Sequence, residues 1–126
     1  MAKSMKDMVS DAEAKVEKVS PHDARTHAAN GDVILDVREA KELENDGRIS
    51  GSLHVPRGVL EAKACVDSEA KDSDLCEARD KGRVHVLCAS GARATLAADT
   101  LQQMGYKSTV IEGGLKGWKD AGLDVS

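Results

Sequence analysis

Cys88 ends a short apolar run and is followed at once by small residues, a pattern that suits nucleophilic chemistry. Val84–Leu87 predicts a strand, and from Ala92 to Met104 small and apolar side chains recur at helical spacing. A short loop at the start of such a helix has backbone N–H groups without intrahelical partners, at the positive end of the helix dipole. These groups stabilise an anion, and the anion that the chain itself supplies is the Cys88 thiolate. We therefore predict that Cys88 is a nucleophile in an anion-binding loop.

The loop itself supports this interpretation over simple core packing. A single cysteine at a strand end is more often a small buried hydrophobe than a reactive group. Here Cys88 is followed by a run that packing alone does not require, namely Ala89, Ser90, Gly91, Ala92 and Arg93. The small residues let backbone N–H groups converge, and the arginine adds positive charge beside the thiol.

A second group of charged residues follows another predicted strand, at positions 32–37. It consists of Asp36, Arg38, Glu39 and Glu42. We favour an ion-pair network that holds the turn over a catalytic role for this group. Arg57 is a weaker candidate, as a contributor of positive potential at the mouth of the site.

Other residues with reactive side chains have no spacing that assigns them a role. His54 could act as a general base for Cys88, but nothing in the sequence places it beside the thiol. Cys65 and Cys76 lie in the weakly patterned segment 61–81, and we expect loop thiols there. A sharper hypothesis is that one of them resolves an oxidised Cys88. No paired ligand spacing predicts a metal site, and no cofactor is predicted.

Strand and helix patterns alternate along the chain. Residues 1–15 predict an exposed, partly helical extension, and residues 16–126 predict one domain. Strands are predicted near 16–19, 32–37, 53–55, 84–87 and 108–111, with helices near 21–30, 40–45, 92–104 and 115–121 and a partly helical segment over 61–81. Such alternation indicates an α/β fold with a mostly parallel sheet, in which ligands bind beyond the carboxyl ends of the strands. Cys88 lies at such an end.

Composition argues against several classes of protein. The 126 residues carry a net charge of −4 with a pI near 5.5. The sequence therefore lacks the excess of basic residues that binding to nucleic acid or an anionic membrane requires. No apolar run approaches the length of a membrane span, and the N-terminus lacks the apolar core of a signal peptide. Three widely spaced cysteines do not form a disulfide framework. These features predict a cytoplasmic protein.

Taken together, several motifs resemble the rhodanese-like sulfurtransferases in their single-domain form. In chain order they are Asp36-Val37-Arg38-Glu39, Gly47 to Ser52, His54 to Gly58, Cys88 to Arg93, Gly113 to Trp118, and Ala121-Gly122-Leu123. The resemblance implies a five-stranded, mostly parallel sheet with helices on both faces. It also implies that Cys88 takes sulfane sulfur from a donor such as thiosulfate or a persulfide, and passes it to cyanide, a small thiol or a thiol on a partner protein. Arg93 would order the loop and strengthen its positive field, since a guanidinium does not titrate usefully.

One departure from the family pattern bears on the donor. Family members that use thiosulfate well often carry a basic residue just after the cysteine, where this chain has Ala89 and Ser90. A persulfide donor is therefore at least as plausible as thiosulfate.

Two other functions compete with sulfur transfer. A phosphatase or arsenate reductase of related fold has five residues between its cysteine and arginine, whereas four separate Cys88 from Arg93. A non-catalytic rhodanese-like module that binds a partner is the other alternative, although such modules usually lack the cysteine.

Overall fold

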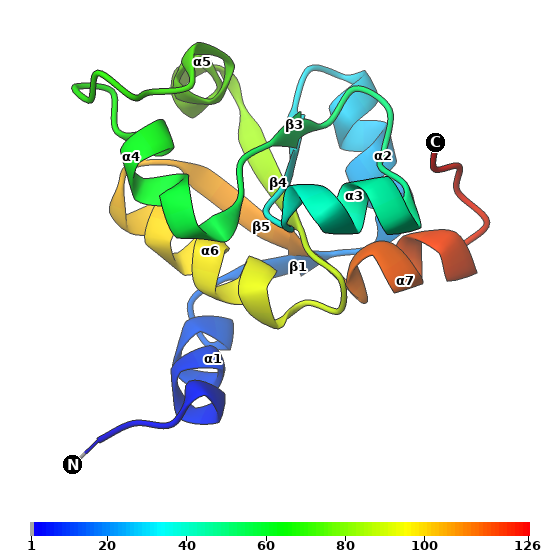
Figure 1. The fold of residues 1–126 in the computed structure, drawn as a ribbon, viewed down its shortest axis with the longest axis horizontal. Coiled ribbons are helices and arrows are strands. Elements are labelled where there is room, and N and C mark those ends of the chain that lie inside the picture. The colour runs from blue at the N-terminus through cyan, green and yellow to red at the C-terminus, as the bar shows by residue number, and fades with distance from the viewer. Residues whose placement is uncertain (1) are drawn as a thin grey trace.

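The computed structural model describes residues 2–126 and contains one five-stranded sheet (Figure 1). The strands are β1 (Glu17–Val19), β2 (Val33–Asp36), β3 (Leu53–His54), β4 (Arg83–Leu87) and β5 (Lys107–Ile111). They lie in the order β1-β5-β4-β2-β3, and each neighbouring pair is parallel. β4, which leads into Cys88, is therefore the central strand.

Helices connect the strands and cover both faces of the sheet. Their bounds are α1 (Met5–Glu13), α2 (Pro21–Ala29), α3 (Ala40–Asp46), η1 (Arg57–Val59, a 3₁₀ turn), α4 (Leu60–Ala64), α5 (Ser73–Lys81), α6 (Ala92–Gln103) and α7 (Gly114–Asp120). The predicted α/β fold, with a parallel sheet between helices, is confirmed.

The core is divided by the sheet, because successive side chains of a strand point to opposite faces. Leu35 and Val86 pack with the side chains of α4, α5 and α6 on one face. Ile34 and Leu87 pack with α2 and α7 on the other face. Trp118 of α7 belongs to this second cluster, where its side chain packs under the sheet. Burial on both faces explains why the central strands are almost continuously apolar.

Helix termini follow the local signals of the sequence. Ser20 caps α2 by accepting a hydrogen bond from the backbone N–H of Asp23, and Pro21 occupies the first helical position. The segment 61–81, predicted as partly helical, contains the end of α4, a connecting loop and α5. The 3₁₀ turn at Arg57–Val59 was not predicted.

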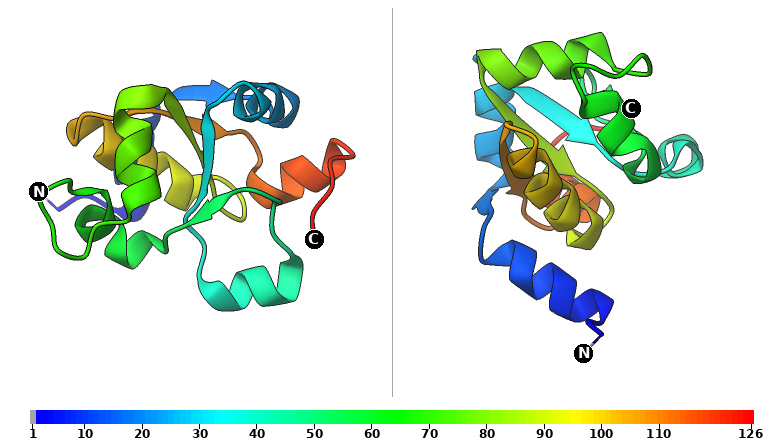
Figure 2. Two further views of the ribbon diagram at one scale, coloured as in Figure 1. Left: turned by 90° about the horizontal axis from the view of Figure 1, so that it is seen from above. Right: turned by 90° about the vertical axis from the view of Figure 1, so that its left-hand side faces the viewer.

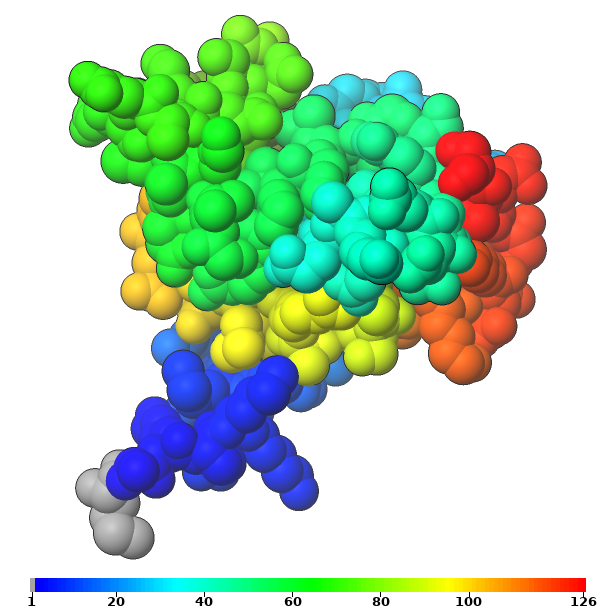
Figure 3. All heavy atoms as spheres, in the orientation of Figure 1, coloured from blue at the N-terminus to red at the C-terminus, as the bar shows by residue number. Residues whose placement is uncertain are grey.

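The N-terminal segment extends away from the sheet. α1 contacts α6 and buries Ala12, while most of its other residues are exposed. It projects from the body of the molecule in Figures 2 and 3. The boundary between an extension and a domain at residues 15 and 16 stays a prediction. Across residues 2–126, no helix combines the length and apolarity needed to span a membrane.

Candidate functional site

Cys88 follows β4 directly, and its side chain lies inside the loop that leads to α6. The residue is only 1% exposed. The backbone N–H of Gly91 donates to its Sγ at 3.0 Å, and the N–H of Ala94 donates at 3.3 Å. Two amides at the positive end of a twelve-residue helix therefore converge on the sulfur, an arrangement that stabilises a thiolate.

The turn before α6 depends on Gly91. Its φ of 126° lies in a region that side-chain-bearing residues rarely adopt. The Gly91 carbonyl accepts two hydrogen bonds from Thr95, one from the backbone N–H at 2.9 Å and one from the hydroxyl at 2.8 Å. The first turn of α6 is thus closed while the Gly91 N–H stays directed at the sulfur.

The start of α7 packs against the loop that follows Cys88, and Figure 1 shows the two lying side by side. The N–H of Leu115 donates to the Cys88 carbonyl at 2.8 Å. A Cβ at Gly114 would lie 2.5 Å from the carbonyl oxygens of both Cys88 and Ala89, so the close contact requires glycine. Sequence reasoning missed this contact between the start of α7 and the loop. The pair of consecutive glycines before a helix was the available signal.

Arg93 points toward α3 and forms a paired contact with Glu42. Its Nη1 donates to Glu42 Oε2 at 2.7 Å, and its Nη2 donates to Oε1 at 2.8 Å. The Arg93 guanidinium lowers the pKa of Glu42 to about 2, so this carboxylate is ionised at neutral pH. Sequence reasoning grouped Glu42 with the turn after β2 and did not connect it to Arg93, because 51 positions separate the two residues.

Asp36 and Arg38 form the ion pair that was predicted at the turn after β2. Arg38 Nη2 donates to Asp36 Oδ2 at 2.7 Å, and both side chains are at most 1% exposed. Arg38 also donates to the carbonyl of Gly47 at 2.8 Å, which ties the end of α3 to the strand. The pair holds the segment that carries Glu42.

Arg57 contacts the flank of α6, and its role at the mouth of the site stays a prediction. Its guanidinium donates to Glu61 at 3.0 Å and to the Thr100 hydroxyl at 3.2 Å. Thr100 lies about 12 Å along α6 from Ala92, at 1.5 Å per residue. The structure therefore places Arg57 on the flank of α6 instead of at the loop.

The remaining sequence candidates also lie apart from the thiol. The ring Nε2 of His54 lies 2.7 Å from the carbonyl oxygen of Arg38, so this histidine braces the turn after β2. Cys65 caps α4 and Cys76 lies in α5. In Figure 1 α4 lies against α6, whereas α5 lies farther from the loop before α6.

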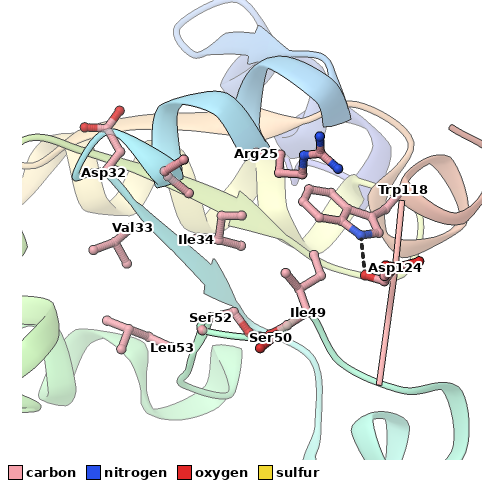
Figure 4. Close-up of a pocket in the computed structure, with 13 residues that line it drawn as sticks. Arg25, Asp32, Val33, Ile34, Ile49, Ser50, Ser52, Leu53, Trp118 and Asp124 are labelled. Carbon is pink, nitrogen blue, oxygen red and sulfur yellow. Dashed lines mark hydrogen bonds between the residues drawn. The ribbon is translucent and has the colours of Figure 1, made fainter. Parts of the chain in front are cut away.

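Two cavities differ in their relation to Cys88. One, of about 400 Å³, borders the loop at Ser90, Gly91 and Ala92 and is closed on its far side by α1. Another, of about 460 Å³, lies between α2, β2 and the C-terminal segment, and Figure 4 shows Arg25 and Trp118 at one end of it. The loop residues do not line this second cavity, so its size does not make it the reactive site.

Comparisons with known proteins agree with this geometry. Residues 20–121 match the model of the rhodanese-like domain. YrkF of Bacillus subtilis, provisionally named a sulfur carrier protein, is 33% identical over 86 residues, which span 68% of this chain and 40% of that protein. A polysulfide-sulfur transferase homodimer from Wolinella succinogenes has a TM-score of 0.73 at 30% identity and covers 96% of this chain and 85% of its own. A Rhodopseudomonas palustris protein of unknown function, suggested to be a tyrosine phosphatase, has a TM-score of 0.91 at 33% identity and covers 100% of this chain and 96% of its own.

Proposed function

The chain belongs to the rhodanese-like family, and from that premise we propose that it is a sulfurtransferase in which Cys88 carries sulfane sulfur as a persulfide. The observation that carries the proposal is the pair of amides directed at Cys88 Sγ, from Gly91 and Ala94. These donors stabilise negative charge on sulfur both before and after the transfer.

The first half of the reaction loads the enzyme. The Cys88 thiolate attacks the outer sulfur of the donor, a new S–S bond forms, and the old bond to that sulfur breaks. The leaving group departs with the electron pair, as sulfite from thiosulfate or as a thiolate from a persulfide. The terminal sulfur of the Cys88 persulfide is then an anion, and loop amides can hold it.

The second half returns the enzyme to its starting state. An acceptor nucleophile, cyanide or a thiolate, attacks the terminal sulfur, and the Cys88 thiolate leaves with the electron pair. The Cys88 thiolate is stabilised by the same two amides, so it is a good leaving group. No cofactor enters either half, and charge balances in both.

We propose persulfides as the favoured donors. Ala89 and Ser90 bring no basic side chain to the loop. A dianionic donor therefore gains little electrostatic attraction from these two positions. Acceptors on this proposal are a small thiol or a cysteine of a partner protein. We propose a reducing compartment such as the cytoplasm, in which Cys65, Cys76 and Cys88 would stay reduced.

The arrangement supports a phosphatase less well. A phosphatase of this kind needs its arginine to bind the oxygens of a phosphoryl group, but both terminal nitrogens of Arg93 bind Glu42. A partner-binding module without catalysis has no need for amides that converge on a thiol.

The proposal is tested by transfer of sulfur to cyanide, measured as thiocyanate, with thiosulfate and glutathione persulfide as donors. We expect turnover by the wild type and by Cys65→Ser and Cys76→Ser, and none by Cys88→Ser. Hydrolysis of p-nitrophenyl phosphate in place of sulfur transfer would favour the phosphatase. Absence of both activities would favour the binding module.

A further inference from the structure

A contact within α3 fixes the position of Glu42 independently of its ion pair with Arg93. It lies in the first turn of α3, where its Oε2 accepts a hydrogen bond from the backbone N–H of Glu39 at 2.7 Å. The turn before α3 is in turn fixed by the buried pair of Asp36 and Arg38. Figure 3 shows α3 and the start of α6 in contact at the molecular surface. Glu42 is therefore a fixed negative charge at the edge of the loop.

This carboxylate neutralises the basic residue of the loop. Arg93 is the one Lys or Arg between Cys88 and the end of the first turn of α6. Its side chain is 34% exposed and that of Glu42 is 29% exposed, so both groups can influence a ligand that approaches from solvent. Because both Nη atoms bind Glu42, the pair presents little net charge to such a ligand.

Several other cations on the surrounding elements are also paired with carboxylates, in each case within 3.3 Å, although the exposed Lys41 of α3 and Lys119 of α7 are not among them. These pairs are Lys18 with Glu13, Arg38 with Asp36, Arg57 with Glu61, and Lys116 with Asp120. These pairs reduce the positive charge that a donor with two negative charges meets as it approaches the loop.

We propose that Glu42 is a specificity-determining residue of the sulfur-transfer site, which withholds the Arg93 guanidinium and so discriminates against dianionic donors in favour of donors of lower charge. This inference rests on the proposed function. Glu42 is not assigned a chemical step; it acts through Arg93 on the electrostatic potential that the donor meets.

Thiosulfate and methanethiosulfonate are a matched pair of donors for the test. In both, the Cys88 thiolate attacks a terminal sulfur attached to a sulfonyl group. Thiosulfate is a dianion that releases sulfite, whereas methanethiosulfonate is a monoanion that releases methanesulfinate. The ratio of kcat/KM for the two donors, with cyanide as acceptor, reports sensitivity to donor charge and cancels general losses of activity.

We expect Glu42→Gln to raise the ratio of thiosulfate to methanethiosulfonate by roughly five- to tenfold, because it frees the Arg93 charge. The gain should shrink as ionic strength rises. Glu44→Gln is the matched control, since it removes the same charge from an exposed position of the same helix, and it should leave the ratio near that of the wild type. In Glu42→Gln combined with Arg93→Gln the gain should disappear.

The outcomes separate this inference from the proposed function. A wild type that turns over neither of these donors and also fails to turn over glutathione persulfide would overturn both. A wild type that is active, with an unchanged or lower ratio in Glu42→Gln, would overturn the inference alone and leave a purely structural role for the ion pair. If Glu42→Gln folds poorly, as judged by its thermal midpoint, Glu42→Ala provides the same comparison with a good helix former.

Discussion

At the scale of single residues, the site depends on backbone positions as much as on the thiol. Cys88 supplies the sulfur, but the N–H groups of Gly91 and Ala94 determine what charge it can bear. Gly114 lets α7 approach the loop and hold the Cys88 carbonyl through the next residue. A substitution there should therefore disturb the reactive sulfur without touching its side chain.

We expect Gly114→Ala to impair both sulfur transfer and folding. Alanine at φ 60° is strained, and its Cβ would meet the carbonyls of Cys88 and Ala89. A destabilisation of about 2–3 kcal/mol and a loss of most activity should result. The control is Gly122→Ala, where φ is 79° but no atom lies within 4 Å of the added Cβ. Chemical denaturation and thiocyanate formation measure both effects, and equal behaviour of the two variants would contradict the contact described here.

Sequence reasoning identified the residues of the loop because they are contiguous. Cys88, Gly91 and Arg93 lie within one strand-loop-helix pattern, so their spacing alone indicates an anion-binding turn. The partners of the loop come from distant parts of the chain. Glu42 and Gly114 reach it through α3 and α7, and only tertiary packing determines which of several acidic or glycine residues does so. The same limit applies to Arg57, whose role at the mouth of the site stays a prediction.

At the scale of elements, the turn between β2 and α3 carries a buried charge pair. Asp36 accepts hydrogen bonds from the backbone N–H of Arg38 and from its guanidinium, and water reaches neither side chain. Removing one partner from such a pair leaves an uncompensated buried charge, which costs more than the pair contributes.

We expect Arg38→Met to destabilise the fold by about 3 kcal/mol, since it leaves Asp36 buried without a cation. Arg83→Met removes an exposed partner of Glu17 and should cost less than about 1 kcal/mol. Urea denaturation of both variants gives the two values. A cost for Arg38→Met as small as that of the control would show that the pair does not hold the turn.

Element types were easier to predict than element bounds. β2 and β4 are buried on both faces, so their apolar runs stand out from the sequence. β3 has only two residues, so its sequence pattern is a weak signal for a strand. Its pairing with β2 stabilises the extended conformation instead. The segment 61–81 has little periodicity because α4 and α5 are short and each buries few side chains. In such regions contacts with the rest of the fold decide the structure.

At the scale of the whole molecule, a cluster of polar side chains surrounds His85 at the middle of β4. His85 is fully buried, with its Nε2 2.9 Å from Asp32 and its Nδ1 2.6 Å from the Thr109 hydroxyl. Its ring stacks on that of His27 at a centroid distance of 5.3 Å. Burial lowers the pKa of His85, although the hydrogen bond that its ring donates to the Asp32 carboxylate opposes this shift.

This lowered pKa predicts a loss of stability in mild acid. The unfolded chain takes up a proton at His85 near pH 6.5, whereas the folded protein resists protonation until a lower pH. The free energy of unfolding should therefore decrease as pH falls from 7 to 5. His85→Gln should flatten this slope, while His22→Gln, at an exposed position of α2, should not. Equal slopes in all three proteins, from urea denaturation at each pH, would show that His85 is not responsible.

The central claim is that Cys88 carries the transferred sulfur, and the mass of the intact, unreduced protein tests it most directly. After incubation with glutathione persulfide or thiosulfate, the wild type should gain one sulfur atom, and cyanide should remove it. Cys88→Ala should gain none, while Cys65→Ser and Cys76→Ser should load like the wild type. Loading of Cys88→Ala, or no loading of the wild type with either donor, would contradict the account.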